Sequence, residues 1–514
     1  MMNGKMKKLA LALGLALGST GLMQSAQAVH VSAENLGQAL IFPYYTVRGG
    51  WSTLFGITNT SNLVVAAKVR FREAYNSRDV FDFVIILSPN DVWTGWVADA
   101  GDRPAIFTED TSCTVGRIPS AGQPFLDGLN TYTGPTADGG PTTPDRMKEG
   151  YVEVIMMGAA QVVTPVPNPD PTPLARGAIH VNGATPPGCN NLVNAFLDYA
   201  QLPALRGEFN QYAVDPTSTP PGRPLNPLKG TFALVNGPQG FNAVGLPVHL
   251  ANFSTGVSAL GAPMLTAQLP QIEAGNVFAD SYNEPSLFSS NTAPEYLGSA
   301  GGSLPAVNAA PPSVTGALEA TNVINEWSRR TNAAAGWVTA TDWVITFPTK
   351  NFYVDNDANN EFAGRNAGRL NNIPNPGLTA ATLTPFSQSF VDTAATTPVR
   401  RGQSCDVVSF ILRNREEQRS QAAGFSPGGT AQLCYETNVL TFNQGAILNS
   451  PIARSINYPE NFTFGWLDVR FAGANALNRG LPAVGFAITT RDDGASELLS
   501  EAAAYDHSIV RPQP

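Results

Sequence analysis

The chain has 514 residues and a formal net charge of −9, and only 14% of its residues are charged, against roughly 25% in an ordinary soluble domain. An acidic chain without a stripe of lysine and arginine cannot neutralise phosphate, which argues against nucleic acid and anionic membrane surfaces as partners. Its 48 glycines and 41 prolines predict many turns and long loops.

The N-terminus has the layout of a cleavable secretory signal. Lysines among the first eight residues precede an apolar stretch, Leu9–Leu17, and the small-residue sequence Ala26-Gln27-Ala28. The apolar stretch is shorter than the roughly 20 residues that span a bilayer, and no later apolar run reaches that length. We therefore expect residues 1–28 to be removed. The mature chain is expected in the periplasm, at the cell surface or outside the cell, without a transmembrane segment.

Four cysteines remain in the mature chain: Cys113, Cys189, Cys405 and Cys434. An even number of cysteines in an oxidising compartment favours disulfides, and sequence order favours pairing the first with the second and the third with the fourth, out of three possible pairings. A metal or redox site is disfavoured because no C-x-x-C spacing occurs.

The first half of the mature chain shows the alternation of apolar and polar residues that is typical of β-strands. The residues Asn59 to Asn62 form a polar link that predicts a hairpin between the first two strands, and Ser88-Pro89-Asn90 is a turn between the next two. Four strands at this spacing predict an immunoglobulin-like sandwich. The strands are expected at Trp51–Asn59, Val65–Phe71, Val80–Leu87 and Asp91–Val97.

Further along, proline-rich segments at 164–173 and 215–224 predict extended loops. Residues 285–315 are rich in Ser, Ala, Pro, Gly and Asn, which is typical of a linker. Short helices are expected at Asn191–Tyr199 and Thr315–Trp327, and strands at Tyr151–Met157, Thr231–Asn236, Ala243–Leu250, Asp342–Phe347, Asp406–Leu412, Leu433–Phe442, Phe464–Phe471 and Leu481–Thr490.

Two of these strands share an order of residue types. Gly150-Tyr-Val-Glu-Val-Ile155 and Gly465-Trp-Leu-Asp-Val-Arg470 both run Gly, aromatic, aliphatic, acid, Val. The agreement suggests an internal duplication, although such short strings also agree by chance.

The predicted fold class is mainly β: two immunoglobulin-like β-sandwich units with long Pro/Gly-rich loops and a few short helices. We expect a signal peptide at 1–28, an N-terminal sandwich with loop insertions at 29–284, a linker at 285–315 and a C-terminal sandwich at 316–514.

Several strings in both halves resemble an uncharacterised family of exported Gram-negative bacterial proteins labelled as cell-surface or hypothetical proteins. This resemblance implies location and architecture, and it brings no catalytic residues with it. The strings are Phe55-Gly-Ile-Thr-Asn-Thr-Ser61, Val69-Arg-Phe-Arg-Glu73, Leu87-Ser-Pro-Asn-Asp-Val-Trp93, Asp342-Trp-Val-Ile-Thr-Phe-Pro-Thr-Lys350, Cys434-Tyr-Glu-Thr-Asn-Val439 and Gly465-Trp466-Leu467.

One string fits the G-x-S-x-G pattern of a serine hydrolase: Gly424-Phe-Ser426-Pro-Gly428. The residue after the serine must supply a backbone N–H to the oxyanion hole, and Pro427 has none. A hydrolase is therefore disfavoured, and no spacing among the acidic residues selects a glycosidase pair.

Metal chemistry has little support. The four histidines, His30, His180, His249 and His507, are far apart in sequence and form no zinc motif. Asp355, Asp357, Asn359 and Glu361 begin like a calcium loop, but Asn360 replaces the usual glycine and Asn366 the usual glutamate. A solvated acidic loop is the preferred interpretation, so no cofactor is expected; calcium remains an alternative.

Two aromatic pairs suggest carbohydrate binding: Trp93 with Trp96, and Tyr44 with Tyr45. Residues an odd number apart point to opposite faces of a strand, so neither pair forms a single platform without a bulge. Packing in the core is the preferred interpretation for the tryptophans.

No catalytic residue can be named from the sequence. The preferred hypothesis is a non-enzymatic exported protein with a structural or interaction role at the surface or in the envelope, contacting a surface glycan or an envelope protein. The alternatives are a glycan-binding or glycan-cleaving protein and a self-assembling coat or filament subunit. The oligomeric state is left open.

Overall fold

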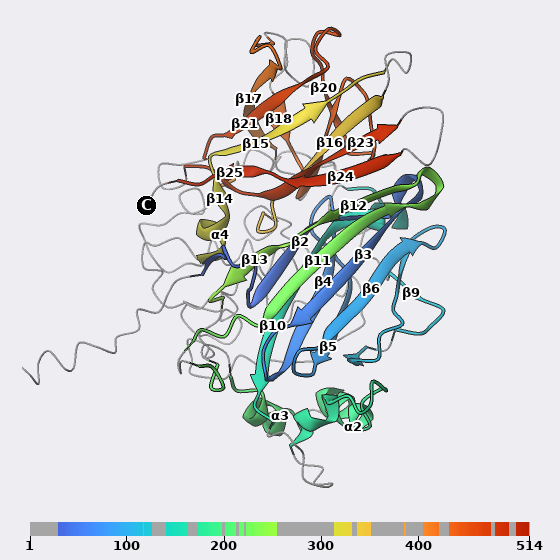
Figure 1. Cartoon of the computed structure of the whole chain (residues 1–514), viewed down its shortest axis with the longest axis vertical. Coiled ribbons are helices and arrows are strands. Elements are labelled where there is room, and N and C mark those ends of the chain that lie inside the picture. Colours follow the sequence, from blue (N-terminus) through green and yellow to red (C-terminus); the bar gives the residue numbers. More distant parts are fainter. Residues whose placement is uncertain are drawn as a thin grey trace, which may run out of the picture.

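The computed structural model describes residues 29–116, 118–125, 140–162, 173–197, 201–211, 215–219, 223–253, 313–331, 337–350, 385–386, 405–420, 431–473, 479–492 and 500–512 (Figure 1). The predicted signal peptide, linker residues 285–312, the calcium candidates 355–361 and the hydrolase-like string 424–428 lie outside these residues. The described chain is mainly β and forms two sandwiches, as predicted.

The first sandwich consists of sheets A and B. Sheet A has the order β1-β13-β2-β10-β4-β5-β8, with β1 His30–Val31, β13 Val248–Ala251, β2 Ala39–Thr46, β10 Glu149–Ala160, β4 Val64–Glu73, β5 Asp79–Leu87 and β8 Cys113–Val115. Sheet B has the order β12-β11-β3-β6-β7-β9, with β12 Phe241–Gly245, β11 Leu228–Asn236, β3 Trp51–Asn59, β6 Val92–Asp99, β7 Pro104–Phe107 and β9 Gln123–Pro124.

The second sandwich consists of sheets C and D. Sheet C has the order β18-β17-β21-β15-β25, with β18 Ala431–Leu433, β17 Asp406–Asn414, β21 Phe464–Phe471, β15 Asn322–Ser328 and β25 Ser508–Val510. Sheet D has the order β20-β19-β16-β23-β24, with β20 Arg454–Ile456, β19 Thr437–Phe442, β16 Val338–Thr346, β23 Val484–Asp492 and β24 Glu501–Asp506.

Short elements complete the described fold. A small two-stranded sheet pairs β14 Glu319–Ala320 with β22 Leu481–Pro482. The helices are α2 Cys189–Leu197, α3 Leu202–Glu208 and α4 Ser313–Leu318, with 3₁₀ turns η1 Arg48–Gly50, η3 Pro144–Lys148, η4 Leu174–Ala178 and η5 Gly237–Gln239. The helix expected at 315–327 is wrong beyond Leu318, because β15 begins at Asn322 and its alternating side chains pack on the second core.

The four strands predicted between Trp51 and Val97 exist, but the predicted hairpin across Asn59–Asn62 is wrong. The single strands predicted at Ala243–Leu250 and Leu433–Phe442 are each divided between two sheets, into β12 and β13 and into β18 and β19. β3 and β6 pair with each other in sheet B, whereas β4 and β5 pair in sheet A. The links at 59–62 and 88–90 therefore cross from one sheet to the other. Buried Asn59 holds this crossing together, because its amide nitrogen donates to the carbonyl oxygens of Leu63 at 2.7 Å and Ser88 at 2.8 Å.

The two sandwiches have the same strand order. Strands β13-β2-β10-β4-β5 of sheet A correspond to β25-β15-β21-β17-β18 of sheet C, and β12-β11-β3-β6 of sheet B correspond to β24-β23-β16-β19 of sheet D. The next strands differ, because β7 is antiparallel to β6 whereas β20 is parallel to β19. Gly150 of β10 and Gly465 of β21 fall on corresponding strands, and a Cβ at either would collide with a carbonyl oxygen of the next strand. The duplication hinted at by these strings is therefore present in the topology.

The sandwiches pack closely against each other (Figure 1). The face of sheet D that points away from sheet C carries Val344, Val439, Phe486 and Ile488, which belong to the apolar cluster of the first sandwich. The Phe486 ring lies 5.4 Å from that of Phe232. The two sandwiches thus share a buried core.

Candidate functional site

The outer face of sheet B, which points away from sheet A, carries an apolar row that crosses five strands. The inward positions of β3 are Trp51, Phe55 and Ile57, so alternation turns Leu54 outward. Direct cross-strand pairing then places one residue of each strand in line: Val244 of β12, Ala233 of β11, Leu54 of β3, Trp96 of β6 and Phe107 of β7.

The row is accessible to solvent. Val244 is 59% exposed and Leu54 is 41% exposed. Trp96 and Phe107 are half-buried, and their rings stack with centroids 5.5 Å apart and planes inclined by 12°. Large exposed apolar side chains that adjoin one another mark contact surfaces more often than scattered ones do.

The rest of this face is mostly uncharged. On one side of the row lie Thr231 and Thr94, and on the other lie Asn242 and Ser52. Among the outward residues of β12, β11, β3, β6 and β7, the charged one is Lys229. The face therefore suits an uncharged or weakly charged partner surface.

The aromatic pairs found in the sequence have different fates. Trp93 is buried in the first core and Trp96 lies on the outer face, so the alternation prediction holds and the core prediction holds for Trp93 alone. Tyr44 and Tyr45 are fully buried, with hydroxyls donating to Glu149 Oε2 and to the Met147 carbonyl oxygen, both at 2.9 Å. The tyrosines therefore form no exposed platform.

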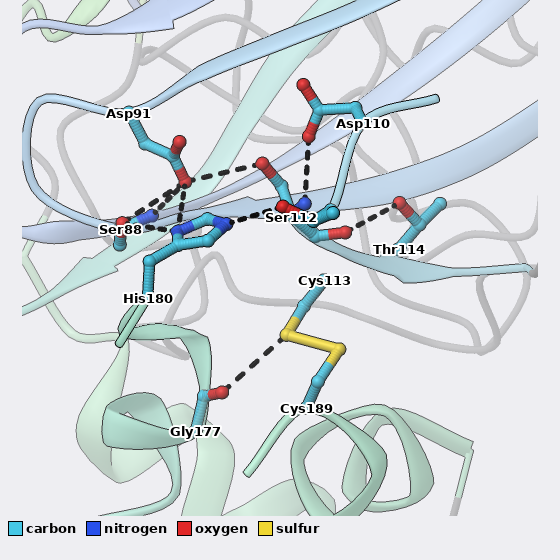
Figure 2. The surroundings of a disulfide bond; sticks show 10 residues. Ser88, Asp91, Asp110, Ser112, Cys113, Thr114, Gly177, His180 and Cys189 are labelled. Carbon is cyan, nitrogen blue, oxygen red and sulfur yellow. Dashed lines mark hydrogen bonds and ion pairs between the residues drawn. A yellow bond between two sulfur atoms is a disulfide. The ribbon is translucent and has the colours of Figure 1, made fainter. Parts of the chain in front are cut away.

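A second candidate site is polar. It joins η4 and α2 to the edge of sheet A at β8 (Figure 2). His180 Nδ1 lies 3.3 Å from Ser88 Oγ and 3.5 Å from Asp91 Oδ2, and its Nε2 lies 3.3 Å from Thr111 Oγ1. Beside it is the disulfide Cys113–Cys189, one of the two pairings favoured by sequence order; the other, Cys405–Cys434, is also present.

The order carboxylate, imidazole, hydroxyl in this cluster matches that of a hydrolase triad, but the surrounding donors do not. An oxyanion hole after Thr111 would need the backbone N–H of Ser112, which donates instead to Asp110 Oδ1 at 2.8 Å. The backbone N–H of Ser88 donates to Asp91 Oδ2 at 3.0 Å. The cluster therefore acts as a clasp between loops, and sequence reasoning missed it because its members are far apart in the chain.

Two further histidines, His249 and His507, are buried. His249 Nε2 accepts from the Gly230 backbone N–H at 3.1 Å, and burial lowers the pKa of His249 to about 4. His507 Nε2 lies 3.0 Å from the Val344 carbonyl oxygen, and burial lowers its pKa to about 3. Within the described ranges, no three His, Cys, Asp or Glu residues gather as metal ligands would.

The face of sheet A that points away from sheet B carries a row of buried ion pairs. They are Lys68–Asp82 at 2.9 Å, Arg70–Asp79 at 3.0 Å and Arg72–Glu153 at 2.8 Å. The alternation of β4 predicts that its basic residues share one face, but it gives no sign that this face is buried. Charges removed from water in this way are paired, and the row is part of the architecture.

Comparison of the chain with protein-family models, with curated proteins and with solved structures gave no match in any of the three. In the part of the chain that the structure describes, no helix has the length and apolar character needed to cross a membrane.

Proposed function

We propose that this chain is a non-enzymatic exported protein of the cell surface or envelope, with a structural or interaction role, and that it meets its partner through the outer face of sheet B. The observation that carries the proposal is the in-register apolar row from Val244 to Phe107. The resemblance of the chain to exported Gram-negative surface proteins and its two disulfides support a location outside the cytoplasm.

The exposed row has a physical cost that a partner would remove. Val244 leaves 59% of its surface in water and Leu54 leaves 41%, and burial of apolar surface is worth about 25 cal/mol per Å². The Trp96 and Phe107 rings widen the same strip, and aromatic side chains are enriched where interfaces are tightest.

The test uses the full-length chain expressed in a Gram-negative host. Fractionation with surface proteolysis should recover it outside the cytoplasm. Purified protein should sediment with envelope fragments, and Trp96→Asp should weaken that binding at least severalfold.

The matched control is Val407→Asp, which places the same charge at a residue of β17 that is 51% exposed on the other sandwich. It should bind like the wild type. Cytoplasmic retention, or equal binding by the wild type and Trp96→Asp, would refute the proposal.

A second candidate function is glycan binding, which the stacked Trp96 and Phe107 favour. Aromatic rings beside a hydroxyl side chain such as that of Thr94 suit a neutral sugar, whose ring offers an apolar face and hydroxyl groups. Retention on one member of a panel of neutral polysaccharides, lost in Trp96→Ala, would support it. No retention on any member would count against it.

A further inference from the structure

The contact between the two sandwiches has a definite layout. The hairpin of β11 and β12 turns the rings of Phe232 and Phe241 inward. Sheet D covers this inner side: Phe486 contacts Phe232, and Ala502 and Ala504 of β24 pack against the same apolar cluster. Figure 1 shows β24 running beside β12. The hairpin β11–β12 thus lies on the outer face of sheet D.

Each partner in this contact has a counterpart elsewhere in the chain. By strand order, the hairpin β11–β12 corresponds to β23–β24, and the outer face of sheet D corresponds to the outer face of sheet B. Pairing of Tyr505 with Ala487, and of Ala487 with Trp343, places Tyr505 on the inner side of sheet D. Tyr505 therefore occupies in β24 the side that Phe241 occupies in β12.

These counterparts are both uncovered. Tyr505 is 53% exposed, whereas Phe241 is 8% exposed. The outer face of sheet B is open along its apolar row, whereas the matching face of sheet D is buried by the first sandwich. One chain cannot join its own two surfaces, because its second sandwich already lies against the inner side of β11 and β12.

We propose that the β23–β24 hairpin of a second copy of this chain packs on the outer face of sheet B around Leu54 and Trp96. The Tyr505 side chain of that hairpin points toward the face. The contact repeats between molecules the packing that already joins the two sandwiches within one molecule. This inference rests on the proposed function, since it names the partner of the same face. A surface that binds a different surface of the next copy is heterologous, so repetition links copies head to tail.

The experiment measures the self-association of the purified full-length protein by sedimentation velocity over a wide concentration range. The wild type should form species that grow with concentration. Leu54→Glu places a charge on the outer face of sheet B, and Tyr505→Glu places one on the β23–β24 hairpin. Each variant should be monomeric. Val407→Glu, at an exposed apolar residue outside both surfaces, should assemble like the wild type.

Mixing the two monomeric variants decides the geometry. Leu54→Glu keeps an intact hairpin and Tyr505→Glu keeps an intact face, so the mixture should form a dimer and nothing larger. Recovery of the dimer also shows that both variants are folded. A face-to-face dimer would instead persist in Tyr505→Glu alone, and that result would overturn the inference.

A wild type that stays monomeric at all concentrations would also overturn it. The proposed function would survive if Trp96→Asp still lost binding to envelope fragments, because the partner of the face would then be another molecule. Loss of both results would remove both proposals.

Discussion

Asp342 is a buried carboxylic acid beside the contact between the sandwiches. It is fully buried on β16, and its Oδ2 accepts from the backbone N–H groups of Ile447 at 2.8 Å and Leu448 at 2.9 Å. The Ile447 carbonyl oxygen in turn accepts from Trp51 Nε1 of the first sandwich at 3.0 Å. Burial raises the pKa of Asp342 from 3.8 to about 7, although the two N–H donors and Arg329 lower it.

This pKa gives the stability of the protein a definite pH dependence. Between the unfolded value of 3.8 and the folded value of about 7, the native state keeps a proton that the unfolded chain has released. The contribution of Asp342 to stability is therefore full below the unfolded pKa and is lost as pH rises through the folded pKa.

Asp342→Asn should remove this slope. In urea unfolding, the wild type should lose stability relative to the variant as pH rises from about 4 to about 7, by a few kcal/mol, and the difference should stay constant above that range. The comparison with the variant cancels the titration of other carboxylates. A difference between the two proteins that does not change with pH would contradict the assignment.

The buried ion pairs of sheet A make a second residue-level prediction. Arg72 and Glu153 are both fully buried and 2.8 Å apart. Glu153→Ala leaves a buried guanidinium without this carboxylate, and such a loss costs about 3–5 kcal/mol. Chemical unfolding should show that loss, while Glu416→Ala, in an exposed pair with Arg415, should cost under about 1 kcal/mol. Equal losses in the two variants would mean that the buried pair contributes nothing special.

The sequence reveals half of this arrangement. Alternation in β4 sets Lys68, Arg70 and Arg72 on one face, as the structure has them. Their partners come from β5 and β10, and no local pattern announces that β10 lies next to β4, because that pairing spans roughly 80 residues of chain.

At the scale of elements, strand positions follow from alternation, whereas strand partners do not. The link 59–62 is polar and short, as in a hairpin, yet it carries the chain from sheet B to sheet A. The difference lies in Asn59. Its buried side-chain amide donates hydrogen bonds to the carbonyl oxygens of Leu63, just before β4, and Ser88, just after β5. A polar residue in a polar link carries no sign of that burial. The sequence does not reveal the apolar row on the outer face of sheet B, because its residues come from five strands whose pairing is not visible in the sequence.

The unit of η4 and α2 is held to sheet A by the Cys113–Cys189 disulfide and the His180 clasp. Replacing both cysteines with serine should lower stability by about 2–5 kcal/mol, since the bond closes a long loop. It should also expose the chain around α2 to protease, while the second sandwich stays intact. Cys405→Ser with Cys434→Ser is the matched control and should leave the α2 region protected. Cleavage first in the second sandwich of the Cys113/Cys189 variant would contradict this division.

At the scale of the whole molecule, the same strand order occurs twice, and sequence alone could only hint at it. Gly150 and Gly465 keep a common residue type because any side chain there would strike a neighbouring backbone. Most other positions need only be apolar or polar in alternation, and many residues satisfy that requirement. Topology can thus persist where residue identity does not.

Because the two sandwiches share a core through sheet D, we expect them to unfold together. Phe486 lies at this contact, against Phe232, and is 1% exposed. Phe486→Ala should cost about 3–5 kcal/mol by leaving a cavity between the sandwiches. The substitution should also split a single calorimetric unfolding transition into two, because the lost contacts are those that couple the two sandwiches.

Phe442→Ala is the control for this coupling. Phe442 is equally buried but packs on Trp327 and Trp343 inside the second sandwich. Its loss should destabilise by a similar amount while the transition stays single, since the contact with the first sandwich remains. Two transitions in the wild type would show that the sandwiches fold independently. The internal packing would then be too weak to serve as a template for assembly between copies.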